Sequence, residues 1–308
     1  YVDVYPTIVP SYENNKEILR KIVNDLKAAK DLLAKCDTIK ENKHWMSTEN
    51  RMLAVNSGTS GELAKDVFFA YRGYRMNYYA VTAMLARVYC WAGEYGNAYK
   101  EAKEVVDATY STGSTSTASC FNFSNSLTTN RKDYNSIIMT FFKSTCYEDY
   151  LPYMTKGNDV VLVVNTTNLF GDEAGADDRN LDLFGDWDGG DIKYSFKYDI
   201  KEGTSGTDMI PAIRLSEMYY IMGEYFAYKD EFSKAGEMLD KVRYARGIST
   251  TNLASSIGSL EVFHTHLIKE MRREFVGEGQ MFFQYKRLDQ KPKDNVVFVF
   301  DKPNNEDI

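Results

Sequence analysis

The chain has 308 residues, of which 44% are apolar and 26% charged, a composition that excludes a disordered or fibrous protein. Its 37 basic and 44 acidic side chains give a net charge of −7, which argues against nucleic-acid binding, because phosphate contacts need clustered cations. The unusual feature of the composition is its number of aromatic residues. The chain contains 23 tyrosines, 17 phenylalanines and three tryptophans, enough to fill a core and leave rings over.

Apolar residues recur every three to four positions in several segments, which predicts amphipathic helices. In chain order, we expect helices over 14–35, 77–109 (two, with a break at Gly93 and Glu94), 212–228, 232–245 and 260–275. Between them, residues 111–130 carry 11 serines and threonines in 20 positions, too many polar side chains to bury. A loop is expected there and at 56–61, and short strands at 136–142, 159–165 and 296–300.

The two central helical pairs repeat each other when the chain is shifted by 137 residues. The matched positions are Ala86 with Gly223, Tyr89 with Phe226, Tyr95 with Phe232, and Ala98 with Ala235. This order of small and aromatic residues is the tetratricopeptide pattern. Small residues are needed in it because paired helices approach closely only where such residues face each other. The sequence therefore predicts a mainly α fold, a tetratricopeptide-like helical-pair scaffold with a loop-rich insertion containing short β-strands.

Three stretches resemble the SusD/RagB family of outer-membrane nutrient-binding lipoproteins. They are Tyr79–Gly93 followed by Tyr95 and Ala98; 208–219 with 239–247; and 268–275 with Glu278, Gly279, Phe283, Lys286 and Arg287. Their order and spacing match the family over about residues 78–290. We accordingly expect one intertwined domain, with scaffold at 1–110 and 211–308 and a ligand-facing insertion at 111–210. The resemblance also implies that the chain is the C-terminal two thirds or so of a longer protein.

The function that this resemblance implies is non-enzymatic capture of an oligosaccharide at the surface of a Gram-negative outer membrane. The glycan would pass to a SusC-like TonB-dependent transporter, and membrane attachment would be only through a lipid anchor missing from this chain. The resemblance implies no cofactor and no nucleic-acid partner. An aromatic-rich chain suits a glycan, because the C–H faces of a pyranose stack on rings while its hydroxyls need polar partners.

Three alternatives remain open, in this order. The first is a peptide-binding relative on the same scaffold, and the second is a tetratricopeptide-type adaptor for partner proteins. The third is a glycosidase using Glu217 and Glu224, which lie seven residues apart on one predicted helical face. Arg214, three residues before Glu217, is expected to form a structural ion pair with that carboxylate instead.

The candidate ligand contacts are rings outside the helical repeat. Trp187 lies among aspartates and glycines without apolar periodicity, so it is the first choice as a stacking platform, with a loop anchor as the alternative. Tyr147, Tyr150 and Tyr153 form a second set, read either as a binding rim or as one buried helical stripe. Trp45 is the third candidate, whereas Trp91 ends a repeat helix and is expected to pack.

Eight acidic residues and one arginine lie between Gly171 and Asp191. Calcium prefers six to eight oxygen ligands, and Asp186, Asp188 and Asp191 could supply some of them. Their spacing does not match an EF-hand, and a solvated acidic loop is the more common outcome for such a run. Calcium is therefore kept as an alternative, and no metal site is assigned.

Overall fold

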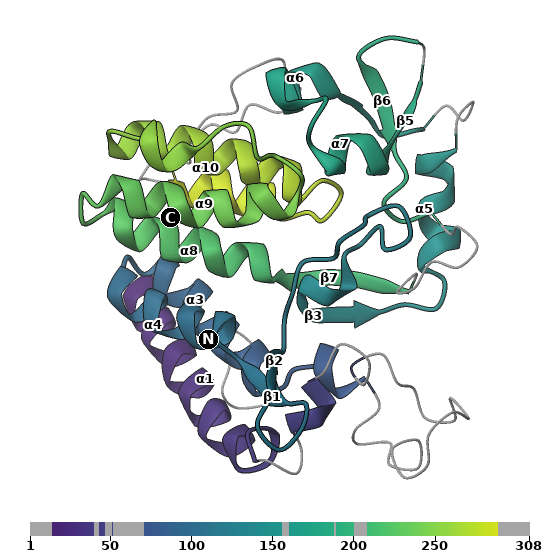
Figure 1. Cartoon of the computed structure of the whole chain (residues 1–308). Helices are drawn as coiled ribbons and strands as arrows, with labels where there is room; N and C mark the ends of the chain where they lie inside the picture. Colours follow the sequence, from purple (N-terminus) through teal and green to yellow (C-terminus); the bar gives the residue numbers. More distant parts are fainter. Residues whose placement is uncertain are drawn as a thin grey trace.

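The computed structural model describes residues 14–39, 43–46, 51, 71–155, 160–187, 189–199 and 208–288. It is mainly helical with small antiparallel sheets, which confirms the predicted fold class (Figure 1). The loop expected at 56–61 and the strand expected at 296–300 lie outside the described residues.

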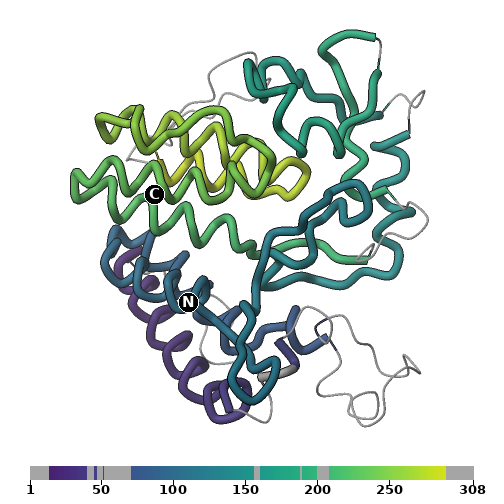
Figure 2. The backbone as a smooth tube through the Cα atoms, in the orientation of Figure 1, coloured from purple at the N-terminus to yellow at the C-terminus, as the bar shows by residue number. Residues whose placement is uncertain are grey.

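The scaffold is a stack of helices. α3 (Tyr78–Trp91) and α4 (Tyr95–Val106) form the first pair, and α8 (Leu215–Ala227) and α9 (Phe232–Ala245) form the second. Helix α4 packs on α8, so the two pairs lie side by side although about 110 residues of chain separate them. The stack runs in Figure 2 from the purple α1 (Asn15–Asp37), which packs on α3, to the yellow-green α10 (Leu260–Glu274), which packs on α8 and α9.

The two pairs share more than their sequence pattern. Ala86, Ala98 and Ala235 are fully buried, and a Cβ added at Gly223 would lie 3.4 Å from the carbonyl oxygen of Ala235. The turns also match, because Gly93 (φ 75°) and the equivalent Asp230 (φ 60°) both adopt the left-handed conformation that ends a helix. Each helical pair is therefore the same local unit, closed by the same turn.

The described part of the insertion, with its edges, contains three small sheets. Strand β1 (Thr109–Ser111) pairs with β2 (Thr117–Ser119), β3 (Ile137–Phe142) pairs with β7 (Met209–Arg214), and β6 (Ile192–Ser195) lies between β4 (Val163–Asn165) and β5 (Phe184–Asp186). All pairings are antiparallel. Among the described residues, the short helices α6 (Thr166–Phe170) and α7 (Asp178–Leu183) were not expected. A third short helix, α5 (Cys146–Met154), agrees with the helical reading of the tyrosines at 147, 150 and 153.

Two predicted boundaries were wrong for a tertiary reason. The helix expected from residue 212 begins only at Leu215, because Met209–Arg214 pairs with β3. Of the strand expected over 159–165, residue 159 lies outside the described residues, and the described part forms a strand only at Val163–Asn165, where it pairs with β6. A final helix, α11 (Met281–Leu288), follows α10 and packs against it.

Candidate functional site

A groove of about 450 Å³ opens where α3, the β3–β7 sheet and α11 meet. Three aromatic side chains on its wall are exposed: Trp91 by 37%, Phe283 by 54% and Phe141 by 60%. The volume is within the range of about 300–1,000 Å³ that is usual for small-molecule sites. Three part-exposed rings around one hollow make this groove the candidate ligand site.

Each ring comes from a different part of the chain. Trp91 is the last residue of α3, and Phe283 lies in the first turn of α11. Phe141 stands near the end of β3, where it is paired in register with Ile210 of β7. Ile210 and its neighbours Pro211 and Ala212 complete the apolar wall. Only the folded chain brings these segments together, so the expectation that Trp91 packs in the repeat missed its exposure.

The polar side of the groove is dominated by Arg87. Its guanidinium binds the Glu217 carboxylate through two contacts of 2.6 Å, and it also donates to the carbonyl oxygen of Ala212 at 2.8 Å. Burial alone would lower the pKa of Arg87, but the Glu217 charge raises it, so the arginine stays charged. Gln280 accepts a longer contact from Arg87 at 3.5 Å.

The acid in the groove wall is also paired. The Glu278 side chain is fully buried and accepts from Arg214 at 2.8 Å and from Lys197. Burial opposes ionisation, but these two cations together hold the pKa of Glu278 below its usual value. The charges facing the groove are thus compensated within the protein, and Gln280 and Gln284 add neutral amides.

The ion pair expected between Arg214 and Glu217 was wrong. Arg214 is the last residue of strand β7 rather than part of a helix, so the i, i+3 geometry does not apply. It binds Glu278 instead, and Glu217 binds Arg87 from the neighbouring repeat. Glu224 is likewise buried and bound by Arg287 at 2.6 and 2.8 Å. Both carboxylates of the glycosidase alternative are therefore held in arginine pairs.

The three tyrosines that the sequence left open as a binding rim or a buried helical stripe lie on one helix, α5. Tyr150 is half-buried and stacks on the buried Tyr198, with ring centres 4.2 Å apart and planes 9° from parallel. Tyr147 is half-buried, whereas Tyr153 is 42% exposed. None of the three lines the groove, although Ile210 belongs both to its wall and to the cluster under α5.

Trp187 lies at the turn between β5 and β6. Its side chain is half-buried, and its backbone N–H donates to the carbonyl oxygen of Ile192 at 3.3 Å. Within the described parts of the chain it contacts no other aromatic ring. Trp45 is only 5% exposed and belongs to the main core, so we leave it out of the proposed ligand surface.

The acidic segment is not simply solvated. Glu173 contacts Arg273 at 2.7 Å and Asp177 contacts Arg179 at 2.7 Å, so two of its acids belong to a buried ionic network. Asp186 is exposed and accepts from the backbone N–H of Gly189 at 3.1 Å, while Asp188 lies outside the described residues. Among the residues that are described, no three His, Cys, Asp or Glu side chains form a metal-binding group.

Stacked helical pairs with a mixed insertion, and an aromatic groove where the two meet, define a helical-repeat scaffold of the ligand-binding type. A model of the SusD family matches residues 71–298, and the chain belongs to that family. Glycan-binding proteins of the SusD family are non-enzymatic. No curated protein matches the chain.

Solved structures show the same fold. A SusD superfamily protein from Bacteroides thetaiotaomicron is 23% identical, with a TM-score of 0.54 over 74% of this chain and 53% of its own. A SusD-like carbohydrate binding protein from Bacteroides vulgatus is 19% identical, with a TM-score of 0.54 over 89% and 52%. Surface glycan-binding protein A from Bacteroides uniformis is 16% identical, with a TM-score of 0.54 over 89% and 57%. The chain thus spans about half the length of these structures. Within the described residues, no helix is long and apolar enough to cross a membrane.

Proposed function

We propose that this protein captures an oligosaccharide at the surface of a Gram-negative outer membrane and passes it to a SusC-like TonB-dependent transporter. Family membership over residues 71–298 supports the proposal, as do the structural neighbours described as carbohydrate binding and surface glycan-binding proteins. The observation that carries it is the groove with the exposed rings of Trp91, Phe141 and Phe283.

The groove has the chemistry that a neutral sugar requires. Trp91 and Phe283 offer ring faces for the C–H side of a pyranose, and the Gln280 and Gln284 amides offer partners for hydroxyl groups. Arg87 and Glu278 already hold opposite charges in ion pairs, so no charge in the groove calls for a charged ligand. This balance favours a glycan over the peptide alternative, whose termini and side chains would need charged partners.

We keep the insertion rings as a second proposed contact. Trp187 and Tyr153 are accessible in part, and a glycan longer than the groove could reach such rings beyond it. If calcium binds, we expect it beside these rings, at Asp186, Asp188 and Asp191.

A tetratricopeptide-type adaptor remains the second alternative. Its partner protein would be expected on the helical stack rather than in the groove.

The test is calorimetric titration of the full-length protein with a panel of soluble neutral glycans, followed by two groove variants. Trp91→Ala and Phe283→Ala should each weaken binding about tenfold or more, because each removes a stacking face. Phe282→Ala is the matched control, since Phe282 is 43% exposed on the same helix but does not line the groove. The proposal fails if no glycan binds, or if binding is seen only for peptides. If Trp91→Ala and Phe283→Ala bind the glycan as tightly as Phe282→Ala, the groove is not the binding site.

A further inference from the structure

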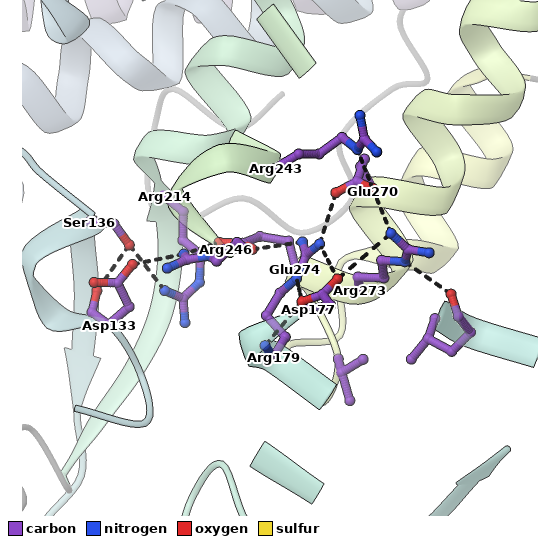
Figure 3. Close-up of polar contacts among 12 residues, drawn as sticks. Asp133, Ser136, Asp177, Arg179, Arg214, Arg243, Arg246, Glu270, Arg273 and Glu274 are labelled. Atoms are coloured by element: carbon purple, nitrogen blue, oxygen red, sulfur yellow. Dashed lines mark hydrogen bonds and ion pairs between the residues drawn. The ribbon is translucent and has the colours of Figure 1, made fainter. Parts of the chain in front are cut away.

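The insertion is joined to the scaffold by buried charged side chains. Helix α10 supplies Glu270 and Glu274, which Arg179 of α7 contacts at 3.0 and 3.2 Å. Arg273 of α10 donates to the backbone carbonyls of Leu169 and Phe170 at 3.0 and 2.6 Å. Figure 3 shows this network, with Arg246 extending between Asp133 on one side and Glu274 on the other.

A small cavity of about 10 Å³ lies inside this network, apart from the groove. Two leucines and nine charged residues line it. Seven of the charged residues are cationic: Arg131, Lys132, Arg179, Lys197, Arg214, Arg246 and Arg273. The other two are the acids Asp133 and Glu274. Apart from Arg131, every lining residue is at most 6% exposed, so water outside the protein does little to screen these charges.

Most carboxylates that pair with these cations lie behind the cavity wall. Asp177 pairs with Arg179, and Glu270 with Arg273. Glu278 pairs with both Arg214 and Lys197. None of these three acids lines the cavity. The network as a whole is compensated, but seven of the nine charged residues that line the cavity are cationic.

Two donors and one acceptor on residues of this wall lack hydrogen bonds among the described residues; the acceptor, Oδ2 of Asp133, still lies 2.7 Å from Arg246 Nη2 as an ion pair. The Nη1 of Arg246 is buried without an acceptor, although Nε and Nη2 of the same guanidinium bind Glu274 at 3.1 and 2.6 Å. The Nε of Arg131 is also buried without an acceptor. Orphaned donors on a buried cation are costly, so each calls for an acceptor.

Lys132, on the cavity wall, loses its proton more readily than an ordinary lysine. Burial is the main reason that the pKa of Lys132 falls to about 8, and the nearby charges of Arg214 and Lys197 lower it further. Cys146 and Asp208 oppose this shift without cancelling it. The lysine donates to the carbonyl oxygen of Met209 at 2.9 Å and lies over the Tyr198 ring.

We propose that this cavity binds one small monovalent anion, with chloride as the ligand. An anion would accept from the orphaned donors of Arg246 and Arg131 and would offset the cationic excess of the wall. The cavity holds about one water-sized sphere, so carboxylates and phosphate are too large for it. Chloride is somewhat larger than water, so its binding requires a small outward shift of the side chains in the wall. Because α7, α10 and β7 all contribute to the wall, the anion would strengthen the junction between the insertion and the scaffold.

The first test replaces chloride with bromide in crystals of the full-length protein and measures anomalous scattering. A bromide peak within contact of Arg246 is expected. A peak confined to the surface, or a water-like density without anomalous signal in the cavity, would overturn the proposal.

The second test follows thermal unfolding at neutral pH in sodium chloride against sodium gluconate at equal ionic strength. The midpoint should rise with chloride and saturate, since gluconate is too large to enter. Lys132→Met should raise the half-saturating chloride concentration at least about tenfold, because it removes one buried positive charge. If that variant does not fold, the bromide peak in the unaltered protein alone decides whether the cavity binds an anion.

Lys30→Met is the matched control. Lys30 is also a partly buried, ion-paired lysine, but it binds Glu101 and Glu104 on α4, away from the cavity. Its chloride response should equal that of the unaltered protein. A midpoint that depends only on ionic strength, or equal shifts in both lysine variants, would contradict a specific anion site.

Discussion

Arg87 of α3 and Glu217 of α8 form a bidentate ion pair across 130 residues of sequence, with both N···O distances at 2.6 Å. The pair joins the first helical repeat to the second at the edge of the aromatic groove. The Glu217 side chain is 2% exposed, so Arg87 rather than water is the partner of its carboxylate. The ion pair therefore belongs both to the polar side of the groove and to the interface between the two repeats.

Glu217→Gln should lower the free energy of unfolding by about 2–4 kcal/mol, since it leaves the Arg87 charge without its buried partner. Urea denaturation measures the change. Arg20→Ala serves as the control, because it breaks an exposed pair with Glu17 on α1 and should leave the midpoint nearly unchanged. A Glu217 variant as stable as this control would contradict the structural role of the pair.

Two helical glycines should respond oppositely to alanine. A Cβ at Gly236 of α9 would lie 2.6 Å from the backbone N and Cα atoms of Ala254, so Gly236→Ala should destabilise the protein by about 1–3 kcal/mol. Gly96 of α4 has open space around it, so Gly96→Ala should be neutral or stabilise by about 0.5–1 kcal/mol. Thermal denaturation of both variants tests these two expectations. If Gly236→Ala stabilised the protein, the close packing of Gly236 against Ala254 would be refuted.

Short and long glycans should separate the two proposed contact surfaces. With a short glycan, Trp91→Ala should weaken binding about tenfold, whereas Trp187→Ala should have no effect, because Trp187 does not line the groove. Titration calorimetry gives both affinities, and a longer glycan then tests whether Trp187 contributes beyond the groove. Loss of short-glycan binding only in the Trp187 variant would move the primary site to the β5–β6 turn.

The insertion should detach from the scaffold in acid. Burial opposes ionisation of Glu173, but hydrogen bonds and charge from Arg273, together with the charge of Arg243, lower its pKa from 4.5 to about 2. A carboxyl with a lowered pKa in the folded state stabilises the protein above its unfolded pKa and loses that contribution as protons bind. Stability should therefore fall as the pH drops from about 4.5 towards 2.

Glu274 and Glu278 act in the same direction. The charges of Arg246 and other arginines outweigh burial and lower the pKa of Glu274, and those of Arg214 and Lys197 lower the pKa of Glu278. Urea midpoints measured across this pH range test the effect. Glu173→Gln should flatten part of the slope, whereas an unchanged slope would exclude Glu173 as a contributor.

The sequence was sufficient where structure depends on near neighbours. Helical periodicity predicted α1, α3, α4, α9 and α10 within a few residues, because their apolar stripes follow directly from residue spacing. The matched pair of repeats was also visible, since small residues at Ala86 and Gly223 are needed wherever two helices cross closely. The start of α8 was misplaced because pairing with β3, a partner about 70 residues away, fixes Met209–Arg214 as a strand.

The candidate site was harder to predict. Phe141 lay in an expected strand and Phe283 in a family-like stretch, but neither showed a sign of exposure, and Trp91 looked like one more packing residue at a helix end. A groove exists only where α3, β3, β7 and α11 meet, and their meeting is set by long-range packing. The arginine partners were equally hidden, since Glu217 could be assigned to Arg214 by spacing but to Arg87 only by contact.

The amino-acid sequence by itself determined the family, the helical repeats and the excess of aromatic rings, because each is written in spacing and composition. Tertiary structure alone decided which rings remain exposed and which charges are neutralised. Exposure and pairing are properties of surfaces brought together from distant segments, and a linear pattern of residues does not contain the distances between those segments.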